Sequence, residues 1–147
     1  MIDRIDARTR SRNMSAVKSK GNLSTEWRLR SRMIQKGING WELHPRDVIG
    51  KPDFVFRREK IAVFVDGCFW HGCRYCRTLP STNKDFWKLK IASNKNRDKL
   101  VRSTLGGLGW TTIAIWEHEI KDDPESCVAA IEFRLRRKRK RTSSSRY

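Results

Sequence analysis

The chain has 147 residues, a length typical of one domain, and 33 Lys and Arg against 16 Asp and Glu leave a formal net charge of +17. Six Trp, six Phe and two Tyr are too many aromatic residues for a disordered protein. The longest apolar run, Ile61 to Val65, is too short to cross a membrane, and the N-terminus lacks the apolar segment of a secretory signal. We therefore expect one hydrophobic core in a cytosolic protein that binds a polyanion, with nucleic acid the first candidate and an anionic membrane surface the second.

The N-terminal third begins with a basic stretch and then a helix. Residues 1–22 are polar and carry six Arg and Lys against two Asp, so we expect an arm with one or two helical turns. Ser24 or Thr25 can cap the helix that follows, and Gly37 is a typical residue just beyond a helix C-terminus. Its apolar positions include Leu29 and Met33.

Three strand-like runs follow, at residues 41–44, 53–57 and 61–66. The short polar segment 58–60 suits an antiparallel hairpin between the last two runs. Residues 61–65 are continuously apolar, which predicts a central strand buried on both faces.

The second half of the chain alternates helices with one strand. After a loop over residues 67–80, the pattern predicts a long helix from residue 81 or 82 to 105, with a break or kink at its polar middle, 93–99. Glycines end this helix, and residues 111–116 form another strand. Pro124 is placed to begin a last helix.

The order of these elements predicts an α/β fold with a mixed central sheet flanked by helices on both faces. Seven of the eight residues from Arg134 to Arg141 are basic, which favours a solvated electrostatic tail. We divide the chain into a basic N-terminal arm that contacts DNA (1–22), one folded domain (23–135) and a basic disordered tail (136–147).

Four cysteines occur in the chain, and without export we expect thiols or metal ligands rather than disulfides. Cys68, Cys73 and Cys76 have the spacing C-x4-C-x2-C, whose C-x2-C half allows two thiolates to reach one tetrahedral zinc. Unligated thiols are the alternative; we favour a structural zinc held by three Cys and one His. The candidates for a fourth ligand are His44, His71, His118 and Cys127, of which Cys127 is better interpreted as a buried structural thiol.

A second pattern is Pro52-Asp53 at the start of a strand, followed by a strand that ends in Asp66. Many metal-dependent nucleases hold Mg²⁺ against the scissile phosphate in this way, because the cation prefers carboxylate and carbonyl oxygens. Pro-Asp is also a common turn before a strand. Such nucleases usually carry an acid and a Lys one residue apart on the second strand, and no such Lys accompanies Asp66.

A third pattern is the adjacent pair Phe69-Trp70 in a polar loop. Neighbouring side chains of an extended segment point to opposite sides, so both rings cannot face one core. Either one ring is buried while the other covers the zinc loop, or the pair forms an apolar wedge that unstacks DNA bases.

Together these residues resemble the very short patch repair (Vsr) mismatch endonucleases of bacteria. The resemblance runs roughly from Thr9 to Glu119, and the run Gly-Cys-Phe-Trp-His at residues 67–71 is its most specific part. It implies a restriction-endonuclease-like fold, a structural Zn²⁺ and a Mg²⁺-dependent nick in one DNA strand beside a T:G mismatch. The other matching segments are Thr9 to Met14, Pro52 to Phe54, Asp85 to Trp87, Asn96 to Asp98, Gly109-Trp110 and Ile115 to Glu117.

The resemblance also implies roles for single residues. Asp53 would be the metal-binding carboxylate, the Val65 carbonyl a second oxygen on Mg²⁺, and His71 the general base that activates water. Glu26 and Asp98 match acidic positions that assist. The DNA wedge falls on Met14, Phe69 and Trp70, and the zinc ligands fall on Cys68, Cys73, Cys76 and His118.

Two departures from the family pattern stand out. The pattern has a His where this chain has Asp66, so an accessory His is lost or replaced by a carboxylate. The zinc ligands are permuted, with His and Cys exchanged at the second and fourth positions, but the total of three Cys and one His is kept. If zinc takes His118, then His71 is available as a base.

The resemblance further implies a monomer in the bacterial cytoplasm, associated with the nucleoid, that acts on double-stranded DNA and meets mismatch-repair proteins. Two alternatives remain. One is a restriction-type endonuclease that cuts matched or modified DNA. The other is a zinc-stabilised DNA-binding module without catalysis, which would leave Asp53, Glu26 and His71 without a role.

Overall fold

The computed structural model describes residues 24–68, 72–73 and 82–144, with side chains as far as residue 140. Its centre is a four-stranded sheet in the order β1 (Glu42–Leu43), β2 (Phe54–Phe56), β3 (Ile61–Asp66), β4 (Thr111–Trp116). The first three strands are antiparallel, and β4 is parallel to β3. The predicted hairpin, the central position of residues 61–66 and the mixed sheet are thus confirmed.

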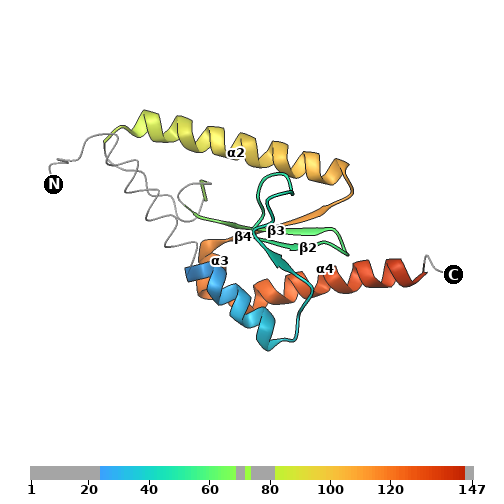
Figure 1. Cartoon of the computed structure of the whole chain (residues 1–147). Helices are drawn as coiled ribbons and strands as arrows, with labels where there is room; N and C mark the ends of the chain where they lie inside the picture. Colours follow the sequence, from blue (N-terminus) through green and yellow to red (C-terminus); the bar gives the residue numbers. More distant parts are fainter. Residues whose placement is uncertain (1–23, 69–71, 74–81, 145–147) are drawn as a thin grey trace.

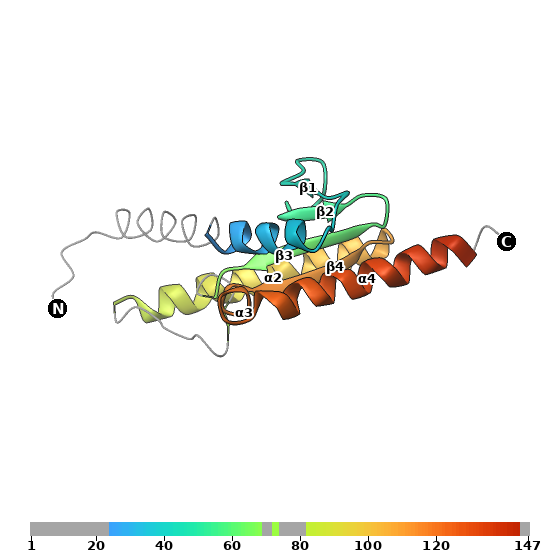
Figure 2. The ribbon, with the colours of Figure 1, turned by 90° about the horizontal axis from the view of Figure 1, so that it is seen from below.

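Helices cover both faces of the sheet (Figure 1). One face carries α2 (Lys84–Gly107), and the other carries the helix at residues 24–35, α3 (Glu117–Asp122) and α4 (Pro124–Ser144). The 24–35 helix contacts α3 and the start of α4 (Figure 2): the Arg28 guanidinium donates to the Lys121 carbonyl at 3.0 Å, and Arg32 pairs with Glu125 at 3.2 Å.

The apolar interior forms two layers, one on each face of the sheet, rather than the single core that we expected. Successive side chains of a strand point to opposite faces. Ile61, Val63 and Val65 of β3 therefore join the layer under α4, and Ala62 joins the layer under α2. Helices on both faces explain why residues 61–65 are apolar without alternation.

The 24–35 helix ends as predicted. Gly37 has a left-handed backbone conformation (φ 74°), which glycine adopts without steric cost. The Ile38 N–H donates to the Met33 carbonyl at 2.9 Å, so the last turn is closed by the pattern typical of a glycine C-terminus. Thr25 and Glu26 are buried polar residues of this helix.

Three helical features differ from the sequence prediction. α2 is one continuous helix through residues 93–99, and its polar middle reflects a buried Asn94 and residues that line a cavity rather than a break. The short helix α3 was not predicted. α4 continues to Ser144, through the first part of the segment that we expected to be disordered.

The extension of α4 has a local cause. Arg and Lys are good helix formers, and Arg136 pairs with Glu132 one turn earlier at 2.8 Å. Arg139 also reaches Glu59 in the β2–β3 turn at 3.3 Å, which ties the extension to the sheet. Among the helices that the structure describes, none is both long and apolar enough to span a membrane.

Candidate active site and metal centre

Asp53 lies where β2 begins, beside the end of β3. The Val65 N–H donates to Asp53 Oδ2 at 2.7 Å, and the Asp53 N–H donates to the Val63 carbonyl at 2.9 Å. The carboxylate therefore sits across the two strands instead of pointing into solvent. It opens into a cavity of about 340 Å³ whose lining residues are Gly50, Lys51, Asp53, Phe64, Val65, Asp66, Arg97, Asp98, Val101 and Arg102.

The Asp53 carboxyl has a pKa raised from 3.8 to about 6. Burial is the main cause, because the charged form loses hydration, and the nearby negative charges of Glu26 and Asp66 raise the pKa further. The Val65 hydrogen bond and His44 act in the opposite direction. Such a half-buried carboxylate, with other negative charges nearby, would be stabilised by a divalent cation.

Glu26 and His44 form a pair next to Asp53. His44 Nε2 lies 2.6 Å from Glu26 Oε1, and the His44 N–H donates to the Asp53 carbonyl at 3.0 Å. Glu26 is only 7% exposed. Ligand atoms of the three residues lie within 4.8 Å of one another, so this cluster could hold a metal ion.

The position of His44 was missed by sequence reasoning, which considered it only as a zinc ligand. It follows from the register of the β1–β2 pair, in which Leu43 faces Phe54. One further step along this antiparallel pair puts His44 opposite Asp53. Both strands are recognisable in the sequence, but the loop between them is long, and its length alone does not determine which residues of the two strands are paired.

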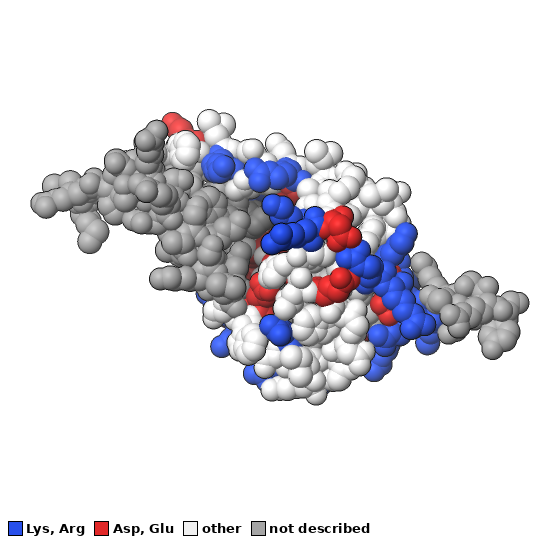
Figure 3. Space-filling model, in the orientation of Figure 1, with Lys and Arg blue, Asp and Glu red and all other residues white. Residues whose placement is uncertain are grey.

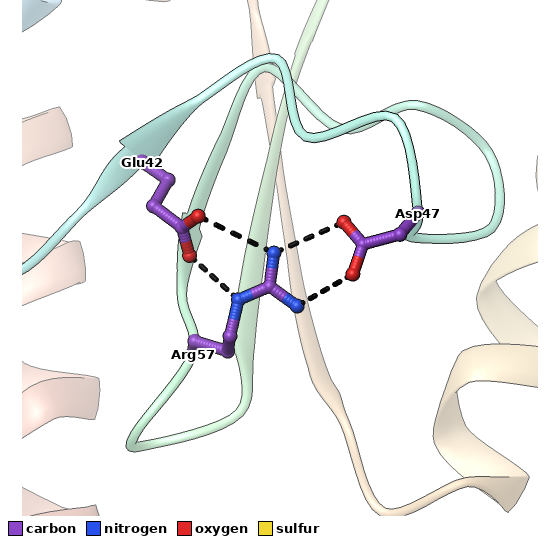
Figure 4. A network of polar contacts seen from close by, with 3 residues as sticks. All are labelled: Glu42, Asp47 and Arg57. Atoms are coloured by element: carbon purple, nitrogen blue, oxygen red, sulfur yellow. Dashed lines mark hydrogen bonds and ion pairs between the residues drawn. The ribbon is translucent and has the colours of Figure 1, made fainter.

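An arginine clamp holds that loop (Figure 4). The Arg57 guanidinium donates to both carboxylate oxygens of Glu42, at 2.6 and 3.3 Å, and to both of Asp47, at 2.8 and 3.0 Å. The hydrogen bonds from Arg57 lower the pKa of Asp47. Because Glu42 precedes the loop and Asp47 lies within it, the clamp fixes the segment that carries His44 and Lys51 to the cavity.

Asp66, at the end of β3, lines the cavity and pairs with a residue of α2. Arg102 Nη2 donates to Asp66 Oδ2 at 2.6 Å, and Asp66 is 5% exposed. Arg102 was not singled out from the sequence, because its contact with Asp66 joins residues 36 positions apart in the chain. On the face drawn in Figure 3, Lys and Arg side chains stand next to groups of Asp and Glu.

A separate cluster of soft ligands lies just beyond the same strands. His118 Nδ1 is 3.3 Å from Cys68 Sγ and 3.5 Å from Cys73 Sγ. Asp66 of β3 faces Trp116 of parallel β4, so Cys68 and His118, each two residues farther on, emerge at the same edge. These three ligand atoms lie within 4.8 Å of one another and could hold a metal.

Two other candidates for the fourth zinc ligand, His44 and Cys127, lie outside the soft cluster. His44 belongs to the cluster with Glu26 and Asp53. Cys127 lies in the apolar layer under α4, where burial raises the pKa of its thiol to about 11, as expected for an inert structural thiol.

Comparison with known proteins identifies the family. A family model described as DNA mismatch endonuclease Vsr matches residues 2–77, about half of the chain. The chain belongs to this family. The DNA mismatch endonuclease Vsr of Escherichia coli strain K12 is 33% identical over 136 residues, which cover 92% of this chain and 86% of the relative.

Two further relatives of this Vsr-family endonuclease are similar over most of their length. The type II nicking enzyme V.XorIIP of Xanthomonas oryzae pv. oryzae is 37% identical and covers 92% of this chain and 96% of its own. The type II nicking enzyme V.NaeI of Lentzea aerocolonigenes is 39% identical over 81% of this chain and 74% of its own. The resemblance predicted from the sequence is confirmed, and the chain is a DNA endonuclease.

The structure brings together many of the site residues that the Vsr resemblance implied. Asp53, Val65, Asp66 and Asp98 line one cavity, and Glu26 joins Asp53 through His44. Cys68, Cys73 and His118 form the soft cluster. The residues that lie outside the described part of the chain are Met14, Phe69, Trp70, His71 and Cys76.

Proposed function

We propose that this Vsr-family endonuclease nicks one strand of duplex DNA beside a T:G mismatch, in a Mg²⁺-dependent reaction of very short patch repair. The observation that carries the proposal is the half-buried Asp53 carboxylate, with its raised pKa, in a cavity that joins acidic and basic side chains. The E. coli relative is named a DNA mismatch endonuclease, and two others are named nicking enzymes, which supports the substrate and the single-strand cut.

The donor set around Asp53 fits Mg²⁺. Carboxylate and carbonyl oxygens are the ligands this cation prefers. The N–H and C=O of one strand residue point to the same edge, so the Val65 carbonyl lies on the side of β3 from which Val65 donates to Asp53. Asp53 and Val65 would hold the ion, with Glu26, Asp66 and Asp98 assisting. When bound, Mg²⁺ neutralises charge on the phosphate.

His71 would act as the general base. In the proposed hydrolysis the water oxygen forms a bond to phosphorus while one phosphorus–oxygen bond of the backbone breaks. The water proton passes to the His71 imidazole, and the departing sugar oxygen takes a proton from solvent. An imidazole with an ordinary pKa near 6.5 suits this task at neutral pH.

The soft cluster would be a structural zinc site. Cys68, Cys73 and His118 supply three of the four ligands for a tetrahedral Zn²⁺, and Cys76 would supply the last. A set of three thiolates and one imidazole leaves no open position for water. The site would therefore stabilise the loop that carries Phe69 to His71 rather than take part in hydrolysis.

Further parts of the proposal concern the whole protein. The mixed sheet with helices on both faces is consistent with a restriction-endonuclease-like fold. We propose a monomer of the bacterial cytoplasm, associated with the nucleoid, whose basic segments 1–22 and 136–147 contact DNA phosphates and whose further partners are mismatch-repair proteins. The net charge of +17 supports such phosphate contacts.

A nicking assay tests the function. The protein is incubated with matched, T:G-mismatched and chemically modified duplexes of one sequence, with Mg²⁺ or with EDTA. The proposal requires one cut, in one strand, only with the mismatch and Mg²⁺. Cutting of matched or modified duplexes would instead favour a restriction-type endonuclease, and binding without cutting would favour a non-catalytic DNA-binding module.

The wedge should be separable from the chemistry. Phe69→Ala or Trp70→Ala should lower discrimination for T:G over matched DNA, because each ring would contribute stacking of ~1–3 kcal/mol per base. Met14→Ala tests the third member of the wedge. Affinities for both duplexes are measured in parallel, with Phe133→Ala, an exposed ring on α4, as the control. Equal losses on matched and mismatched DNA would show that the rings serve packing.

A further inference from the structure

Arg102 is held in the candidate active-site cavity by two contacts. Its Nη2 donates to Asp66 Oδ2 at 2.6 Å, and its Cζ lies 5.9 Å from the centre of the Phe64 ring. Its side chain is 32% exposed, whereas that of Asp66 is only 7% exposed. The buried Asp66 carboxylate and the Phe64 ring hold the Arg102 guanidinium in place, and the guanidinium is still open to the cavity. It is therefore pre-organised to bind a ligand.

The ligand chemistry follows from the charges of the cavity. Asp53, Asp66 and Asp98 line it, so a phosphate entering there meets three carboxylates. A Mg²⁺ ion held by Asp53 would offset part of this negative charge, and a cationic side chain close to the phosphate would offset more. A guanidinium has five N–H donors in a planar fork, which can hold a carboxylate and a phosphate oxygen at once.

The chain also lacks the usual source of that cation. Nucleases with an acid on the second strand commonly place a Lys two positions later, and here that position is Cys68. The Cys68 thiol is turned to the cluster with Cys73 and His118, 3.3 Å from His118 Nδ1. The positive charge in this cavity comes instead from Lys51 and from α2, which supplies Arg97 and Arg102.

We propose that Arg102 binds a non-bridging oxygen of the phosphate that is cut, and that Asp66 is the residue that positions it. Negative charge on these oxygens increases as water attacks, so the contact strengthens in the transition state. This inference rests on the proposed nuclease function and adds a catalytic residue to it. Lys51 and Arg97 line the same cavity and contribute charge, but no contact comparable to the Asp66–Arg102 pair fixes either one in the described structure.

The first test compares three variants by single-turnover nicking at saturating enzyme. Arg102→Gln should slow the cut by ~10²–10³-fold, the range for loss of one donor to transition-state charge. Arg102→Lys should fall between this variant and the wild type, because a point charge lacks the planar fork. Arg58→Gln, which removes an exposed charge from the β2–β3 turn, should cut at nearly the wild-type rate.

A double variant distinguishes a phosphate contact of Arg102 from a purely structural role of the Asp66–Arg102 pair. Arg102→Gln alone leaves the buried Asp66 charge without its partner and could lower stability for that reason. Asp66→Asn/Arg102→Gln removes both charges and keeps the shape, so its melting temperature should return toward that of the wild type. Because Asp66 also lies in the catalytic cavity, the single variant Asp66→Asn is the reference for the rate. If Arg102 binds the phosphate, the double variant cuts much more slowly than Asp66→Asn. If the pair is structural only, nicking in the double variant recovers to the rate of Asp66→Asn, and the proposal is wrong.

A sulfur substitution locates the contact on the substrate. Each of the two non-bridging oxygens of the cut phosphate is replaced by sulfur in turn, and the resulting loss of nicking rate is measured for the wild type and for Arg102→Gln. At the oxygen that Arg102 contacts, sulfur should slow the wild type more than it slows Arg102→Gln. Identical sulfur effects in both proteins at both positions would contradict the proposal. A wild type that cuts no duplex overturns the proposed function and this inference together, whereas recovery of nicking in the double variant overturns the inference alone.

Discussion

Asp53→Asn should abolish nicking and leave DNA binding intact or tighter. The amide is a poor ligand for Mg²⁺, whereas loss of a negative charge that faces phosphate favours binding. Nicking of a T:G duplex and affinity for the same duplex in Ca²⁺ are the two measurements. Asp122→Asn, the same change at an exposed position of α3, is the control. Residual nicking above a few per cent would exclude Asp53 as the principal metal ligand.

The same substitution should stabilise the folded protein at neutral pH when Mg²⁺ is absent and the soft cluster keeps its metal. A folded-state pKa of about 6, raised from 3.8, means that the folded protein binds the Asp53 proton more tightly than the unfolded chain does. The resulting stability is full below about pH 4 and is lost as the pH rises through 6. The loss approaches ~3 kcal/mol above that pH, and Asn avoids it.

The pH dependence of the wild type provides an independent check. Nicking should fall as the pH drops through about 6, because a protonated Asp53 cannot hold the cation. Raising the Mg²⁺ concentration should move the midpoint to lower pH, since metal and proton compete for one carboxylate. A melting temperature that rises steadily from pH 5 to pH 8 in the absence of Mg²⁺ would contradict the raised pKa of Asp53.

Removal of the soft-cluster metal should unfold the domain. Structural zinc sites of this composition contribute ~10–16 kcal/mol of apparent binding free energy, more than the stability of most small domains. Cys73→Ser or a strong chelator should therefore abolish the folded state, measured by circular dichroism, and the native protein should hold one zinc per chain. Cys127→Ala, which changes a buried thiol outside the cluster, should keep the zinc.

The proposed roles of His71 and His118 can be told apart by the same measurements. His118→Ala should lose zinc and stability, because His118 Nδ1 lies 3.3 and 3.5 Å from two thiols. His71→Ala should keep both and slow nicking by ~10²–10⁴-fold. If His71→Ala loses zinc while His118→Ala keeps it, the assignments are exchanged, and hydrolysis needs another base.

The strands were predictable because local patterns determine them. Residues 61–65 are apolar and three of the five are β-branched, and the polar turn before them favours a hairpin with the preceding strand. α3 was not predictable in this way, since its six residues, Glu117–Asp122, contain one buried apolar side chain and so show no period. The length of α4 was missed because a run of basic residues looks the same in sequence whether or not acidic partners such as Glu59 hold it.

The candidate site was predictable only where chemistry and motif coincide. Asp53 stood out after a proline at a strand start, and the cysteines stood out by their spacing. Neither a motif nor a spacing marks His44 or Arg102 in the sequence. The register of β1 and β2 brings His44 to Asp53, and the contact between α2 and β3 brings Arg102 to Asp66. Contacts of this kind join residues far apart in the chain and are set by tertiary packing.

One short stretch of backbone connects the two centres of this molecule. Asp66 faces the cavity and Cys68 belongs to the soft cluster, so at most about 7 Å of extended chain separates the residue that orients Arg102 from a thiolate. Displacement at one end must be felt at the other. Oxidation or alkylation of the Cys68 or Cys73 thiol is therefore expected to slow hydrolysis, although no sulfur atom of the described residues lines the cavity.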